Sequence, residues 1–437
     1  MSAPLTLGKV SRFFAPLALS WMLMSAETPV AVSILSQGGN DALIAGFLVV
    51  MGLSIWIESP VIDLLATGTT FARNAHNLRV LQKFALILMS LVTLAHAAVA
   101  FTPLYDWLVR DVLGVPDAVR DVARVPFQIM TPWSALIGWR RWRQGVMIRA
   151  GRTRPVSVGT ILRLFTIFGF GWGLARGTNL GPLEAVAAAL VLSVAFECAF
   201  IHFAAGPALH QIAQASPDPG PLLSLRELWR FHWPLTGATL VMMLSSPLIA
   251  ASVSRVESSV LHMASWQTAL AITSMFRSIT FGLSEVIIAL GHDDAAHHVL
   301  RQFCARVGLG LSGLILVLWL TQADAWIFTH VLSASPEVLA LARQAFLMCL
   351  AMPLLGAAIG YAKGRLTQAK LTLARLWGIV AGIGALALGL TLGVQYGWPG
   401  VVVAAVGIVM SQSAELTAYV VLWRRHLRRQ PVLGPSA

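Results

Sequence analysis

Apolar runs of about 20 or more residues recur along nearly the whole chain. A helix of about 20 residues spans about 30 Å, the thickness of the hydrocarbon core of a bilayer. Only 11% of the 437 residues are charged, whereas soluble domains carry about 25%, so a soluble fold cannot hide this much apolar surface. A transmembrane β-barrel would instead show alternating segments of about ten residues. The sequence therefore predicts an all-α polytopic membrane protein.

Twelve transmembrane helices account for these runs. We predict them at residues 13–36, 42–70, 81–108, 117–145, 155–176, 182–207, 229–254, 260–290, 304–326, 337–362, 371–394 and 398–423. About 23 of the 31 Lys and Arg residues fall in loops on one side of these spans, against about five on the other. The net charge of +12 therefore indicates membrane sidedness rather than nucleic-acid binding. We predict an inner (plasma) membrane protein, embedded in the lipid bilayer, with both termini cytoplasmic.

The two halves of the chain repeat each other. Residues 12–17 (RFFAPL) open the first predicted span, and residues 230–235 (RFHWPL) open the seventh, about 218 positions later. Because six spans separate the copies, both halves have the same orientation, which defines a parallel repeat. The sequence predicts two six-helix lobes related by a parallel pseudo-twofold repeat, as in a MATE-like fold.

A single loop has the composition of a linker. Prolines and glycine cluster between Gln211 and Ser224. We predict an N-terminal lobe at residues 1–210, a cytoplasmic linker at 211–226, and a C-terminal lobe with a basic tail at 227–437. A bundle of two lobes can close its own core, so we expect a monomer.

Sequence motifs of catalysis are missing. The chain has no nucleotide-binding loop, nucleophile elbow, metal-ligand spacing or dinucleotide-binding fingerprint, so we predict that it is not an enzyme and holds no cofactor. Without a nucleotide-binding domain, any transport is secondary or facilitated. The informative residues are ionisable groups inside apolar spans, because each costs several kcal/mol unless it faces a cavity or a partner.

Carboxylates in the first two predicted spans are the candidate coupling-ion ligands. Glu27 lies midway along the first span, two residues before Pro29, and proline frees a backbone carbonyl that helps to coordinate a proton or cation. Glu58 and Asp63 lie on neighbouring faces of a helix that bends around Pro60. We predict that Glu27 and Asp63 bind H⁺ or Na⁺; the alternative for each is a structural pairing with a neighbouring helix.

The repeat places Glu58 opposite Arg277. Two interpretations remain open: the residues line a central cleft from opposite lobes, or each pairs within its own lobe. Weaker candidates are ionisable residues that can reach water near a helix end, namely Glu197, His202, Glu285 and Glu415.

The densest cation cluster is residues 138–145 (GWRRWRQG), with a counterpart at residues 363–365. Guanidinium groups bind carboxylates and phosphates bidentately, so we interpret the two clusters as an electropositive funnel for an anion at the cytoplasmic mouth of a cleft. The alternative is ordinary membrane anchoring, with Trp139 and Trp142 at the interface. The predicted substrate-binding residues are Glu58, Arg141, Arg143, Arg277 and Lys363.

The chain resembles known transporters in several short motifs. Its two parallel six-span halves, the acid in the first span, and the connection from Gln144 to Pro155 resemble the MATE-like (MOP) superfamily of exporters. Glu27 in its setting, residues 59–64 (SPVIDL) followed by Gly68, and residues 132–139 are similar to the progressive ankylosis (ANK) family.

The resemblance implies a V-shaped fold of two lobes with alternating access. Resemblance to the ANK family implies export of small anions such as citrate, pyrophosphate or nucleotides. Resemblance to MATE transporters implies cation-coupled expulsion of organic cations. The clustered arginines favour the anion, so we predict a secondary active transporter that exports small organic anions. The alternatives are a proton- or sodium-coupled multidrug antiporter, a flippase for a lipid-linked substrate, and a non-transporting membrane scaffold.

Overall fold

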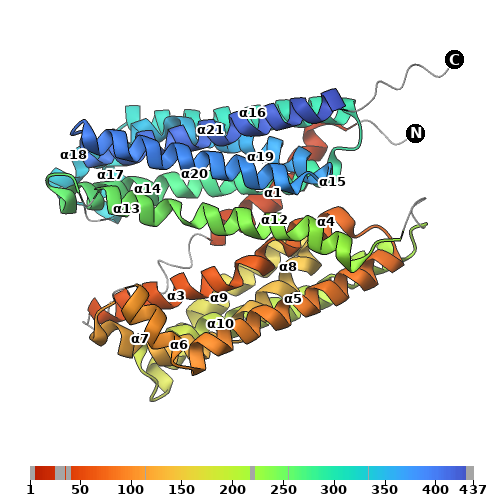
Figure 1. The fold of residues 1–437 in the computed structure, drawn as a ribbon, viewed down its shortest axis with the longest axis horizontal. Coiled ribbons are helices and arrows are strands. Elements are labelled where there is room, and N and C mark those ends of the chain that lie inside the picture. Colours follow the sequence, from red (N-terminus) through yellow and green to blue (C-terminus); the bar gives the residue numbers. More distant parts are fainter. Residues whose placement is uncertain are drawn as a thin grey trace. The chain divides into compact units, whose positions relative to one another are not determined.

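The structure is a computed structural model that describes residues 5–24, 35, 41–113, 115–216, 222–253, 255–332 and 334–429. Within these ranges the ordered elements are helices, with no strand (Figure 1). Ten helical segments in the described ranges are long and apolar enough to cross a membrane. Since a spanning helix satisfies its backbone hydrogen bonds internally, this architecture is that of a multi-pass integral membrane protein, as predicted.

Ten of the twelve predicted spans coincide with these ten segments. The first predicted span, 13–36, lies partly outside the described residues. The fourth, 117–145, forms helices α7 (Asp117–Ile129) and α8 (Trp133–Arg149) and is not among the ten. Its arginines lower its mean hydropathy, so the count of twelve stays a prediction.

The chain divides into two compact units by packing. The first unit is Ala15–Thr236, and the second is Gly237–Ala437 together with Met1–Phe14. The division falls inside two helices, α1 (Leu7–Met24) and α12 (Leu225–Met243), rather than at a loop. The predicted linker at 211–226 lies within the first unit, partly outside the described residues, and the predicted lobe boundaries stay a prediction.

Helices fill both units (Figure 1). Besides α7, α8 and parts of α1 and α12, the first unit contains α3 (Asp41–Ile62), α4 (Leu64–Phe71), α5 (Ala75–Phe101), α6 (Leu104–Asp106), the π-helix η2 (Trp107–Val112), α9 (Arg154–Gly177), α10 (Pro182–Ala204) and α11 (Gly206–Ala213). The second unit contains α13 (Ser245–Val253), α14 (Ser259–Phe281), α15 (Leu283–Leu290), α16 (Asp294–Leu320), α17 (Ala323–Trp326), the π-helix η3 (Ile327–Val331), α18 (Pro336–Met348), the 3₁₀-helix η4 (Cys349–Ala351), α19 (Met352–Gln368), α20 (Thr372–Gln395) and α21 (Gly400–Arg429).

The sequence repeat is a repeat of helices. Helices α5 and α16 each have 27 residues, α7 and α18 each have 13, α8 and α19 each have 17, and α9 and α20 each have 24. Helices α5 and α16 also begin alike: the Asn74 side chain accepts a hydrogen bond from the Asn77 amide, and the Asp293 side chain accepts one from the Ala296 amide. Residues at the same position in paired helices are therefore called equivalent below.

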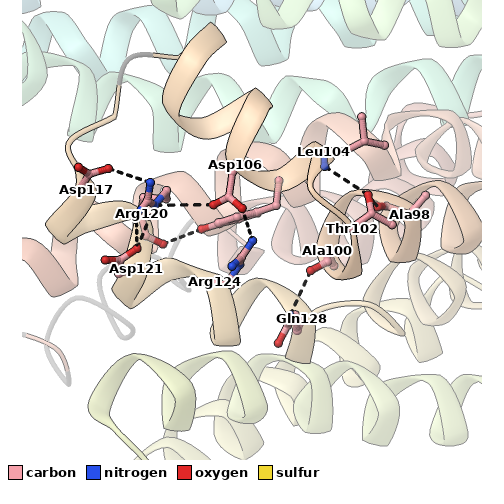
Figure 2. Close-up of polar contacts among 11 residues, drawn as sticks. Ala98, Ala100, Thr102, Leu104, Asp106, Asp117, Arg120, Asp121, Arg124 and Gln128 are labelled. Atoms are coloured by element: carbon pink, nitrogen blue, oxygen red, sulfur yellow. Dashed lines mark hydrogen bonds and ion pairs between the residues drawn. The ribbon is translucent and has the colours of Figure 1, made fainter.

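An ion pair is part of this repeat. In the first unit, Asp106 Oδ2 lies 2.5 Å from Arg124 Nη2, and its other oxygen lies 3.7 Å from Arg120 Nε (Figure 2). In the second unit, Asp324 Oδ2 lies 3.0 Å from Arg343 Nε. Arg124 and Arg343 are each the eighth residue of their helices, α7 and α18. In each unit, an ion pair thus joins the short helix before the π-helix to the helix after it: α6 to α7, and α17 to α18.

Helices α4 and α8 approach closely at two glycines. A Cβ atom on Gly145 would lie 2.5 Å from the Leu65 carbonyl oxygen and 3.1 Å from the Cα of Gly68. Gly145→Ala is therefore expected to destabilise the protein by about 1–3 kcal/mol, because backbone cannot move aside cheaply. Thermal unfolding in detergent measures this loss. Gly169→Ala is the control, since its Cβ would meet nothing within 4 Å; equal melting temperatures for both variants would contradict the prediction.

Candidate functional site

Helix α8 carries three arginines into the interior of the first unit. It packs against α3, α4, α5 and α10, so most of its circumference is covered by other helices. As a result Arg140, Arg141 and Arg143 are all buried, with exposed fractions of 1%, 6% and 8%. A guanidinium group in such a setting needs anionic or π partners. We therefore take α8 as the centre of the candidate site, and the partners of its three arginines follow.

Glu197 on α10 binds two of the buried arginines. Its Oε2 atom lies 2.7 Å from Arg140 Nη1 and 3.4 Å from Nη1 of Arg163, which α9 contributes. All three side chains are at most 3% exposed. The triad therefore joins α8, α9 and α10 in the core of the unit. The sequence marks Glu197 only as a weaker candidate and does not single out Arg163, because hydropathy alone does not tell which face of a helix is covered.

Glu58 on α3 is the second carboxylate of this cluster. It is buried, and its Oε2 atom has no hydrogen-bond partner among the described residues. It interacts electrostatically with Arg140, Arg141 and Arg163. Three guanidinium groups and two carboxylates thus belong to one cluster, whose formal charge with both carboxylates ionised is one net positive charge. We call these five residues the first-unit cluster.

Arg141 differs from its neighbours. Within the described part of the chain it makes no ion pair, and its Nε atom has no hydrogen-bond partner. Its guanidinium carbon instead lies 5.1 Å from the centre of the Trp21 ring. A cation–π contact leaves the in-plane N–H donors of a guanidinium group available for an anion.

Arg143 lies in an aromatic setting. Its guanidinium carbon is 4.6 Å from the ring centre of Trp139 and 5.0 Å from that of Trp142, and Nη1 reaches the His202 carbonyl oxygen at 3.5 Å. The structure places Arg143 apart from the ion pairs of Arg140. Its predicted role in substrate binding stays a prediction.

Asp63 lies at the break between α3 and α4 and is buried. Beside this break, His232 of α12 is hydrogen-bonded to the Pro60 carbonyl oxygen and to the Thr67 hydroxyl. The Asp63 carboxylate interacts electrostatically with the His232 ring. His232 was not a sequence candidate, although it stands where the first copy of the RFFAPL repeat has Phe14. The other predicted coupling residue, Glu27, lies outside the described residues.

The second unit holds a smaller cluster, in which two of the three charged residues match positions of the first-unit cluster and Lys363 matches Gln144. Glu415 is the sixteenth residue of α21, as Glu197 is of α10, and its Oε1 lies 3.0 Å from Lys363 Nζ on α19. Arg277 lies five residues before the break at Gly282, as Glu58 does before Asp63, and it interacts electrostatically with Glu415. Two cations and one carboxylate again leave one net positive charge.

Metal binding finds no support in the described part of the chain, where no group of three His, Cys, Asp or Glu residues could hold an ion.

Comparisons with known proteins give matches in structure alone. No family model matches the sequence, and no curated protein matches it. The chain is similar to the crystal structure of the eukaryotic MATE transporter AtDTX14, with a TM-score of 0.73 and 12% identity over 97% of each chain. It is also similar to an outward-facing multidrug resistance MATE family transporter of the MOP superfamily, with a TM-score of 0.71 and 15% identity over 96% of this chain and 95% of that one.

A third similar structure is a MOP superfamily transporter from Pyrococcus furiosus, with a TM-score of 0.71 and 14% identity over 96% of this chain and 95% of that one. Its description states that a reverse polarity of the binding pocket suggests a different function. Identities this low establish a fold and no more. The predicted MATE-like fold is thereby confirmed: the chain has the fold of the MATE transporters of the MOP superfamily.

Proposed function

We propose that the protein is a secondary transporter that exports small organic anions, such as citrate, pyrophosphate or a nucleotide, by alternating access. The observation that carries this proposal is the net positive charge of the first-unit cluster, with the Arg141 guanidinium outside its ion pairs. Guanidinium donors in a setting of low dielectric bind carboxylate and phosphate groups strongly. The resemblance of the first half to the ANK family supports the same substrate class.

The second unit supports the proposal with its own surplus of positive charge. Arg277 and Lys363 face one carboxylate, Glu415. The Pyrococcus furiosus transporter, whose pocket polarity is described as reversed, supports the view that this fold serves substrates of more than one charge. We further propose a monomer in the inner membrane with both termini cytoplasmic, and H⁺ or Na⁺ coupling through Glu27 and Asp63.

A second candidate is a proton- or sodium-coupled multidrug antiporter. The similarity to a multidrug resistance MATE transporter and the buried carboxylate of Asp63 favour it. This candidate predicts movement of organic cations rather than anions.

Counterflow of labelled citrate into proteoliposomes tests the proposal, with a cationic dye as the parallel substrate and with pH and sodium gradients varied. We expect citrate uptake. Dye movement without citrate movement would favour the antiporter, with Glu27 and Asp63 as its coupling carboxylates.

Arg277→Gln is expected to lower citrate uptake about tenfold or more, because a charge-assisted hydrogen bond contributes about 1.5–3 kcal/mol. Arg306→Gln is the matched control, because it removes the same charge from an exposed position. Initial rates of counterflow give the comparison. Unchanged uptake by the Arg277 variant would remove this residue from the substrate site.

A further inference from the structure

His232 is a buried histidine with both ring nitrogens bonded. It is the eighth residue of α12 and is 1% exposed. Its Nε2 atom lies 2.7 Å from the Pro60 carbonyl oxygen, and its Nδ1 atom lies 2.8 Å from Thr67 Oγ1. The ring also contacts Phe84 of α5, with centroids 5.2 Å apart. The histidine therefore joins α12 to α3, α4 and α5 within the first unit.

The bonds of His232 define its tautomer. A carbonyl oxygen only accepts, so Nε2 carries a hydrogen and donates it to Pro60. In the neutral ring Nδ1 then accepts from the Thr67 hydroxyl. In the protonated ring Nδ1–H donates to Thr67 Oγ1, and that hydroxyl turns to donate to the Asp63 carbonyl oxygen, 3.1 Å away. Both protonation states are thus hydrogen-bonded without movement of a heavy atom.

The charge of the protonated ring has one nearby counterion among the described residues. Asp63, at the junction of α3 and α4, acts electrostatically on the ring. The other elements packed against it contribute uncharged groups: α3 the Pro60 carbonyl, α4 the Thr67 hydroxyl and α5 the Phe84 ring. Burial in an apolar interior disfavours a histidinium ion, and the negative charge of the Asp63 carboxylate acts in its favour.

The second unit shows that the fold does not require this polar arrangement. Phe14, the eighth residue of α1, is equivalent to His232, and it packs edge-on against Phe303, the equivalent of Phe84, at 5.3 Å. Val286 follows the Gly282 break by four residues, as Thr67 follows Asp63. Apolar side chains thus fill both positions in one copy of the repeat, whereas a histidine and a hydroxyl fill them in the other.

We propose that His232 is a proton-binding site of this protein, which takes up a proton at Nδ1 while Thr67 relays the hydrogen bond to the Asp63 carbonyl oxygen. One proton is bound, the imidazole becomes an imidazolium, and no other bond breaks. Helix α12 carries this charge, and its residues after Thr236 belong to the second unit. A coupling of this proton to anion movement rests on the proposed function.

Nitrogen NMR of the full-length protein with ¹⁵N-labelled histidine, in lipid nanodiscs, tests the site directly. The resonances missing in His232→Phe, the substitution that the second unit itself uses, identify His232 in the wild type. We expect Nδ1 to become protonated as pH falls from about 8 to about 5. An Nδ1 that stays unprotonated over this whole range would overturn the proposal.

His96 is the matched control within the same unit. Its Nε2 atom also bonds a backbone carbonyl, that of Phe127, but its Nδ1 atom has no hydrogen-bond partner among the described residues. We expect His96, identified through His96→Phe, to stay neutral where His232 titrates. Thr67→Val, which leaves the histidine in place, is expected to weaken proton binding at His232 about tenfold, a shift of about one pH unit. An unshifted titration in Thr67→Val would overturn the relay.

Counterflow separates this inference from the proposed function. If the wild type transports citrate with a pH dependence, His232→Phe is expected to flatten that dependence, and an unaltered profile would overturn the coupling. If the wild type moves no anion, the proposed function fails, and the NMR titration alone decides whether His232 binds a proton.

Discussion

Glu197→Gln is expected to destabilise the protein by about 3–5 kcal/mol, because it leaves two guanidinium groups buried without their carboxylate. Arg140 and Arg163 both bond the same oxygen of Glu197, and all three side chains are at most 3% exposed. Water cannot reach the groups to replace the lost charge. Thermal unfolding of the purified protein in detergent, followed by intrinsic tryptophan fluorescence, measures the effect as a large fall in melting temperature.

The second unit provides the control for this prediction. Glu415 is equivalent to Glu197 but pairs with Lys363, and these two side chains are 14% and 19% exposed. Glu415→Gln is therefore expected to cost clearly less, since solvent compensates part of the loss. Equal falls for the two variants would contradict the assignment of the larger effect to burial. Arg140→Gln combined with Glu197→Gln should recover part of the loss, because one stranded charge is removed.

Arg141→Gln is expected to lower citrate uptake about 10- to 100-fold and to change the melting temperature little. Within the described part of the chain this guanidinium makes no ion pair, so its removal strands no carboxylate. It does remove charge-assisted donors, which contribute about 1.5–3 kcal/mol to the binding of an anion. Initial rates of counterflow, together with thermal unfolding, measure both parts of the prediction.

Two variants control the Arg141 experiment. Arg152→Gln removes the same charge from an exposed position beyond the end of α8 and should leave uptake unchanged. Arg141→Lys keeps the charge but loses the planar fork, and should recover part of the activity. Full uptake by Arg141→Gln would show that the anion does not bind at this residue.

The membrane class, the helical fold and the repeat were predictable because each depends on residues close in sequence. Apolar runs identify spans by length and composition. The likeness of residues 12–17 to residues 230–235 predicted the repeat, whereas the equal lengths of paired helices, such as α5 with α16, came from the structure. The fourth span was the exception in hydropathy, since the arginines of α8 are buried among helices rather than exposed to lipid.

The partners of the ionisable residues were not predictable in the same way. Glu197 ranked as a weaker candidate because it can approach a helix end in sequence, yet it lies at the centre of the first-unit cluster. Its partners come from α8 and α9, and their pairing depends on how each helix is rotated about its axis. The predicted site roles of Glu58, Arg143, Arg277 and Lys363 stay predictions.

By itself, the sequence determined an all-α membrane protein with a parallel repeat and an excess of positive charge, because hydropathy, periodicity and composition are properties of the chain. Only the tertiary structure decided that Arg140 and Arg163 share Glu197, that Arg141 makes a cation–π contact with the Trp21 ring, and that His232 is hydrogen-bonded to Thr67. The physical reason is that a charge in an apolar interior is stabilised only by the groups packed against it, and those groups lie far away in sequence.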